Sequence, residues 1–202
     1  MSGGQGDQSG RRVGLDGYEV VVGVCGGIAA FKTCHVVSQL VQQRCGVSVA
    51  MTEAAARFVG PLTFQALSGR QVFTSQWEPG DRYDHQHIRL TDAADLIVVA
   101  PATANIIGKA ASGIADDLVS TLIISADSPV LMAPAMNARM WSNPIVQGNV
   151  ERLRSVGYHF VGPEAGWLSC RTVGMGRMAE PEAILDAVIK LLTTRPPKSG
   201  SS

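Results

Sequence analysis

Short, continuous apolar runs alternate along the chain with longer segments in which apolar residues recur at helical spacing. The apolar runs are rich in valine and isoleucine and predict strands that are buried on both faces. These strands are expected at residues 18–25, 46–51, 94–100, 129–133 and 158–161. Helices are expected at residues 28–43, 53–68 with a break at Gly60-Pro61, 102–111, 117–125, 144–156 and 181–192.

Because strands and helices alternate, the pattern predicts an α/β fold of the Rossmann-like, flavodoxin type. Such a fold has one parallel sheet with helices on both faces, here in a single domain. A ligand binds to this kind of sheet beyond the carboxyl ends of the strands, where the strand order reverses. The predicted strand ends carry Gly26-Gly27, Thr52, Ala102-Thr103 and Ala135-Met136-Asn137. We therefore expect one small-molecule site at this edge of the sheet.

The composition favours a folded domain and argues against several kinds of partner. The chain has 202 residues, of which 46% are apolar and 17% charged, and this is enough to bury a core. Because the formal net charge is zero, we expect binding neither to nucleic acid nor to an anionic membrane. We expect residues 1–17 to be a disordered tail, 18–194 the folded domain and 195–202 a flexible tail, since both ends are rich in small or polar residues.

The four cysteines are Cys25, Cys34, Cys45 and Cys170, and no two of them have the close spacing of a zinc site. We therefore expect no metal, and reduced thiols in a cytoplasm are the simplest interpretation. The first three cysteines lie in predicted strands or helices and are interpreted as core residues. Cys170 lies in a polar, glycine-spaced segment, which indicates an accessible loop.

The segment Gly26-Gly27-Ile28-Ala29 opens a helix directly after a strand, which is the geometry of a phosphate site. The spacing of a dinucleotide-binding motif is missing, so one phosphate fits better than a pyrophosphate. Thr52, at the next strand end, can add a hydroxyl group. A tight turn without any ligand is the alternative interpretation of the glycine pair.

Residues 134–141 and 170–181 each mix polar, sulfur-containing and bulky apolar groups that a core does not need together. Asn137 can hold a ligand carboxylate or amide, because its side chain has both donors and an acceptor. His85 and His87 would share one face if this segment were a strand, although a surface role is the commonest one for a histidine. An imidazole titrates near pH ~6.5 and so can accept a proton at neutral pH.

These segments resemble motifs of the homo-oligomeric, FMN-containing cysteine decarboxylases. Residues 134–141 match the proline–x–methionine–asparagine–x–x–methionine–tryptophan signature, and residues 170–181 are similar to the substrate clamp of the phosphopantothenoylcysteine-specific members. Residues 101–106 resemble a proline–alanine–serine–alanine–asparagine–threonine motif, with Thr103 in the serine place and Ile106 in the last. His87, but not His85, fits the histidine–isoleucine–x–leucine motif.

The resemblance implies FMN-dependent decarboxylation of 4′-phospho-N-pantothenoylcysteine to 4′-phosphopantetheine in coenzyme A biosynthesis, by a trimer or dodecamer with each site between subunits. It implies a catalytic base at His87 and a proton donor at Cys170. The implied substrate-binding residues are Asn137, Met140, Arg171, Met178 and Ala179. The implied FMN-binding residues are Gly26, Gly27, Ile28, Ala29, Thr52, Phe58, Ala102, Thr103, Asn105, Asp117 and Ala135.

Three alternatives stay open within the resemblance. Arg171 stands where the coenzyme A enzymes usually have glycine, which leaves room for an oxidative decarboxylase of peptide C-terminal cysteine. Cys170 and the clamp oppose a flavin prenyltransferase, and His87, Asn137 and Cys170 together oppose a non-catalytic FMN-binding subunit. The chain ends soon after its last predicted helix, so we expect the synthetase activity of the pathway to reside in a separate protein.

Overall fold

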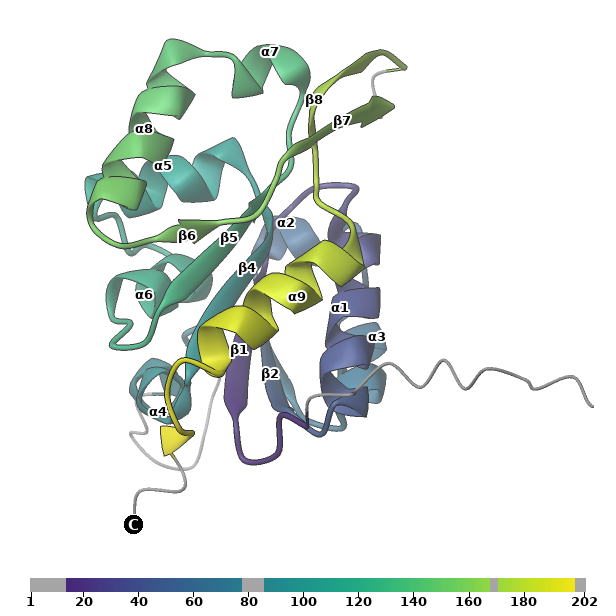
Figure 1. The fold of residues 1–202 in the computed structure, drawn as a ribbon, viewed down its shortest axis with the longest axis vertical. Coiled ribbons are helices and arrows are strands. Elements are labelled where there is room, and N and C mark those ends of the chain that lie inside the picture. The colour runs from purple at the N-terminus through teal and green to yellow at the C-terminus, as the bar shows by residue number, and fades with distance from the viewer. Residues whose placement is uncertain (1–13, 78–85, 168–170, 199–202) are drawn as a thin grey trace, which may run out of the picture.

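The computed structural model describes residues 14–77, 86–167 and 171–198, although the side chains of Gln86 and His87 lie outside the description. Its centre is a parallel sheet with the strand order β3-β2-β1-β4-β5-β6 (Figure 1). The strands are β1 (Glu19–Val24), β2 (Gly46–Met51), β3 (Val72–Phe73), β4 (Leu96–Ala102), β5 (Val130–Pro134) and β6 (His159–Phe160). The predicted Rossmann-like parallel sheet is therefore confirmed. Of the six strands of this sheet, only the two-residue strand β3 was not predicted.

Helices cover both faces of the sheet, as the alternating pattern predicts. The helices are α1 (Ala30–Gln42), α2 (Glu53–Ala56), α3 (Pro61–Ser68), α4 (Gln86–Ala93), α5 (Ala104–Ser112), α6 (Leu118–Ile124), α7 (Ala138–Trp141), α8 (Pro144–Ser155) and α9 (Pro181–Leu192). Figure 1 shows α1, α3 and α9 on one side of the sheet and α5, α6 and α8 on the other.

Successive residues of the central strands face opposite helical layers, because side chains alternate along a strand. In β1, Val20 and Val22 pack into the core beneath α1, α3 and α9, whereas Val21 packs into the core beneath α5, α6 and α8. A strand buried on both faces needs a continuous apolar run, which explains why the valine-rich runs predicted the sheet.

Two segments near the proposed catalytic residues differ from the sequence-based interpretation. Residues 86–93 form the helix α4, so His87 does not lie in a strand, as was considered for the histidine pair. His85 lies outside the described residues. Residues 158–161 are not the last strand. An antiparallel hairpin follows, made of β7 (Glu164–Trp167) and β8 (Val173–Arg177), where a glycine-spaced loop was expected.

Gly176 fixes the base of this hairpin against the segment that leads into α7. Its carbonyl oxygen accepts a hydrogen bond from the Met136 N–H at 2.9 Å. Its φ is +135°, and a Cβ atom at this position would lie 2.2 Å from the Met136 carbonyl oxygen. Only glycine fits such a close approach, and β8 is therefore held beside residues 136 and 137.

The folded part extends beyond the expected boundaries at residues 17 and 195. Leu15 is fully buried, and its N–H donates to the Gln43 carbonyl at 2.9 Å. At the other end, the Lys198 N–H donates to the carboxylate of Asp95 at 2.7 Å. Residues 14–17 and 195–198 are thus part of the packed domain. The buried side chain of Leu15 holds the first segment, and the hydrogen bond to the buried carboxylate of Asp95 holds the second. Among the helices of residues 14–198 that are described, none is long and apolar enough to cross a membrane.

Candidate functional site

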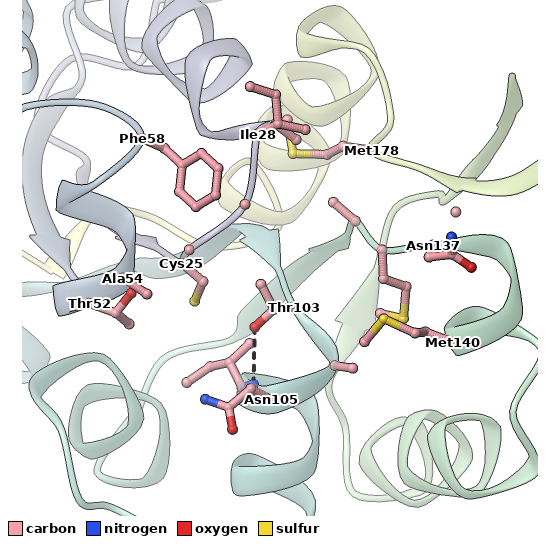
Figure 2. Close-up of a pocket in the computed structure, with 18 of the residues that line it drawn as sticks. Cys25, Ile28, Thr52, Ala54, Phe58, Thr103, Asn105, Asn137, Met140 and Met178 are labelled. Atoms are coloured by element: carbon pink, nitrogen blue, oxygen red, sulfur yellow. Dashed lines mark hydrogen bonds between the residues drawn. The ribbon is translucent and has the colours of Figure 1, made fainter. Parts of the chain in front are cut away.

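A cavity of about 970 Å³ opens at the carboxyl ends of β1, β4 and β5. The strand order reverses between β1 and β4, and so the cavity lies where ligands bind in such sheets. The sequence-predicted residues that line it are Gly26, Gly27, Ile28, Ala29, Thr52, Phe58, Thr103, Asn105, Asp117, Ala135, Asn137, Met140 and Met178. Figure 2 shows side chains from both halves of the sheet facing this space.

The remaining predicted residues do not line the described cavity wall. Ala102 and Ala179 are buried in the protein core, where the Ala102 carbonyl accepts a hydrogen bond from the Ala135 N–H. Arg171 is exposed and has a left-handed backbone, with φ of +62°. Cys170 lies outside the described residues, and of His87 only the helical backbone is described.

The turn between β1 and α1 presents backbone donors to the cavity. Within the described chain, the N–H groups of Gly27, Ile28 and Ala29 make no hydrogen bond, and no side chain caps α1. Gly26 lets this turn approach α2, since a Cβ atom there would lie 2.4 Å from the Cβ of Ala54. Free donors at the start of a helix favour an anion, so the geometry fits a single phosphate.

Two threonines place hydroxyl groups on the cavity wall while they cap helices. The Thr52 hydroxyl accepts from the Ala55 N–H at 3.2 Å, and the Thr103 hydroxyl accepts from the Ile106 N–H at 3.3 Å. Thr103 is therefore the N-cap of α5. Figure 2 shows Thr103 next to Asn105, which lies in the first turn of α5.

Lys109, which the sequence-based reasoning missed, holds two carboxylates at the cavity. Its Nζ lies 2.6 Å from Asp116 Oδ1 and 2.6 Å from Asp117 Oδ2. Burial alone would lower the pKa of Lys109, but hydrogen bonds to both carboxylates outweigh it and raise that pKa. Asp117 also caps α6 by accepting from the Ser120 N–H at 2.9 Å. The one available signal was the helical spacing that puts Lys109 one turn after Asn105.

Asn137 is held in a defined orientation at the start of α7. Its side-chain oxygen accepts the Arg139 N–H at 2.8 Å, which makes it the N-cap of that helix. With the oxygen engaged in this way, the amide nitrogen is the group that can donate to a ligand carboxylate. Met140 follows within α7 and also lines the cavity, as Figure 2 shows.

Cys25 lies at the floor of the cavity but is not a nucleophile. Burial, followed by the negative charge of Asp117, raises the pKa of its thiol to about 12. A thiol with such a pKa stays protonated and inert at neutral pH. Cys25, Cys34 and Cys45 are free cysteines, and the core interpretation is confirmed for Cys25 and Cys45, which are buried.

Four charged and aromatic residues that no sequence motif singled out also line the cavity: Phe31, Lys32, Arg57 and Trp167. Lys32 Nζ lies 2.9 Å from a carboxylate oxygen of Glu180, which also pairs with Arg177. Burial and the nearby Arg177 lower the pKa of Lys32. In the described part of the chain, no three His, Cys, Asp or Glu side chains gather as a metal site.

Comparison with known proteins agrees with this geometry. The family described as Flavoprotein matches residues 10–193. The chain is 49% identical over 171 residues to the coenzyme A biosynthesis bifunctional protein CoaBC of Bacillus subtilis (strain 168). The aligned region covers 85% of this chain and 42% of that protein. The chain thus spans less than half the length of the curated relatives it matches.

Two solved structures share the fold over almost their whole length. One is the FMN-dependent cysteine decarboxylase SpaF, with a TM-score of 0.75 and 33% identity, covering 88% of this chain and 96% of that one. The other is a cysteine-to-serine mutant of a PPC decarboxylase complexed with pantothenoylaminoethenethiol, with a TM-score of 0.77 and 28% identity, covering 86% and 97%.

Proposed function

The chain belongs to the flavoprotein family, and from this premise we propose that it decarboxylates 4′-phospho-N-pantothenoylcysteine to 4′-phosphopantetheine with FMN, as a carboxy-lyase of coenzyme A biosynthesis. One observation carries the proposal: a single cavity joins the phosphate-type turn at Gly26–Ala29 to the Asn137 segment. The similarity to a coenzyme A biosynthesis protein and to a PPC decarboxylase supports the choice of substrate.

The cavity fits FMN in size and chemistry. Its volume of about 970 Å³ lies at the upper end of the range for small-molecule sites. The donors of Gly27, Ile28 and Ala29 suit the phosphate, and the wall around them carries Ile28 and Phe58, which are more than half exposed and suit an aromatic ring. Thr52, Thr103, Asn105 and Asp117 would hold the remaining polar groups. When bound, FMN supplies two-electron oxidation and reduction of the carbon that carries the substrate thiol.

The residues of the chain would then bind the substrate and move its protons. The amide nitrogen of Asn137 would hold the carboxylate that leaves as carbon dioxide. His87 would accept a proton from the substrate, and Cys170 would donate a proton to the enethiol carbon that decarboxylation leaves behind. Met140 and Met178 would line the apolar side of the bound substrate.

We further propose that the protein acts in the cytoplasm as a homo-oligomer, a trimer or dodecamer with each site between subunits. Ile28, Phe31, Phe58 and Leu62 are apolar and at least half exposed, and the first three lie at the cavity. A neighbouring subunit can cover exposed apolar side chains of this kind. The three free cysteines support a reducing compartment.

Oxidative decarboxylation of a peptide C-terminal cysteine is the second candidate. It is favoured by Arg171, which is exposed between the two strands of the hairpin and stands where the coenzyme A enzymes usually have glycine. The two candidates differ in their products, because the peptide-type reaction stops at the enethiol.

The test is mass spectrometry of the product formed by the purified protein. With 4′-phospho-N-pantothenoylcysteine we expect loss of carbon dioxide and a fully reduced thiol, and with a peptide ending in cysteine we expect no turnover. The protein should be yellow. An absorption spectrum without flavin bands, even after addition of FMN, would contradict the whole proposal.

Gly26→Ala is expected to weaken FMN binding by about tenfold or more, because overpacking at a close approach displaces the turn. The added methyl group would lie 2.4 Å from the Cβ of Ala54, which is too close for two carbon atoms that are not bonded to each other. Gly148→Ala is the matched control, since a Cβ atom there meets nothing within 4 Å. The dissociation constant from quenching of flavin fluorescence decides the outcome. Equal affinities in the two variants would mean that the turn does not bind the cofactor.

A further inference from the structure

Trp167 is a large aromatic side chain that lines the cavity and is nevertheless 64% exposed. It is the last residue of β7, in the hairpin beyond the carboxyl ends of the strands. An exposed aromatic residue in the wall of a concave site is free to pack against an apolar part of a ligand.

The pairing of the hairpin explains why the indole has no cover of its own. Trp167 pairs with Val173 and Ala165 pairs with Met175, so these four side chains share one face. On the other face, the side chain of Arg177 lies over Gly166, within 2.9 Å of where a Cβ atom would stand. Val173 is 76% exposed and Met175 is 45% exposed, so the hairpin itself leaves the apolar face largely bare.

The hairpin also stands on the side of the cavity where Asn137 lies. The hydrogen bond from the Met136 N–H to the Gly176 carbonyl fixes β8 beside the segment that leads into α7, and Figure 1 shows the hairpin next to α7. The phosphate-type turn belongs to the β1–α1 connection instead. Asn137 and Trp167 line the same cavity, so a substrate whose carboxylate is held by Asn137 can extend its other end toward Trp167.

We propose that Trp167 determines substrate specificity by packing its indole against the geminal dimethyl group of the pantothenoyl arm. This inference rests on the proposed function. The dimethyl-bearing carbon is the one branched apolar group in that substrate, whose remaining arm consists of amides, a hydroxyl and a phosphate. The indole of Trp167 gives the dimethyl group an apolar surface to pack against, so that both are removed from water.

The experiment compares two substrates in the full-length, FMN-loaded protein: 4′-phospho-N-pantothenoylcysteine and its analogue in which both methyl groups are replaced by hydrogen. For the parent we expect the analogue to have a KM about tenfold higher, the effect of losing two buried methyl groups. In Trp167→Ala the KM for the natural substrate should rise about tenfold to the level of the analogue, with kcat unchanged. Trp167→Phe should keep most of the discrimination.

Trp77→Ala is the matched control, because Trp77 is 81% exposed and does not line the cavity. Calorimetric binding of 4′-phosphopantetheine to each variant provides a second measurement that needs no turnover. The inference is overturned if Trp167→Ala affects both substrates alike or leaves the KM ratio of the parent intact. A parent that releases no carbon dioxide from either compound refutes the proposed function itself, and this inference with it.

Discussion

The His87→Asn variant is expected to bind FMN like the parent but to release carbon dioxide at least about a hundredfold more slowly, the usual contribution of a general base. Asparagine is close to histidine in size and polarity, but it cannot accept a proton at neutral pH. The backbone of His87 lies in the first turn of α4, outside the segments that carry the proposed FMN-binding residues. Loss of turnover with retained flavin absorption is therefore the expected signature.

His85→Asn is the matched control for this variant and should remain active. Only His87 stands in the histidine–isoleucine–x–leucine arrangement, followed by Ile88 and, at the last position, Leu90. Release of labelled carbon dioxide and titration with FMN, done on both variants, separate a chemical role from a structural one. If His85→Asn is the inactive variant, the assignment of the base is wrong.

The fold could be predicted because each central strand is buried on both faces and therefore reads as an apolar run. The hairpin could not be predicted, since Gly166, Gly174 and Gly176 remove the alternation that identifies a strand. Its pairing depends on the tertiary contact at Met136, which leaves no local signal. The two-residue strand β3 is too short to show any period.

The location of the candidate site followed from the rule on strand ends, whereas its individual side chains followed only in part. Ala102 lies inside the cofactor motif, but it is the last residue of β4 and its side chain is buried. A motif identifies neighbours in sequence, and alternation along a strand decides which of them face the ligand. Lys32 and Lys109 lie in predicted helices, but the pattern does not show that their side chains face the cavity, and Trp167 lies in the unpredicted hairpin.

The ion pairs of Lys109 with Asp116 and Asp117 likewise could not be predicted from the sequence. Asp116 and Asp117 begin a helix and could be interpreted as ordinary helix-start charges. Only the structure brings Lys109 to both of them, and its hydrogen bond lowers the pKa of the Asp116 carboxyl. The raised pKa of Lys109 and the lowered pKa of Asp116 both favour the charged forms, so this pair stays charged at neutral pH next to the proposed flavin site.

Replacement of Cys170 by serine is expected to leave carbon dioxide release running while the product stays oxidised. Decarboxylation calls on Asn137 and His87, whereas reduction of the enethiol also requires a proton at the adjacent carbon. A thiol has a reference pKa near ~8.5 and can supply that proton, but a serine hydroxyl is far less acidic. The variant should therefore accumulate an enethiol product that is lighter than the parent's product by two hydrogen atoms.

Mass spectrometry of single-turnover products measures this difference directly, and Cys34→Ser serves as the control because Cys34 is a partly buried thiol of α1 that does not line the cavity. The control should give the same fully reduced product as the parent. If Cys170→Ser does so as well, Cys170 is not the proton donor, and another group must protonate the enethiol carbon. If the parent itself yields the oxidised product, the protein is an oxidative cysteine decarboxylase, and Arg171 at the position after Cys170 is then the residue to examine for a peptide substrate.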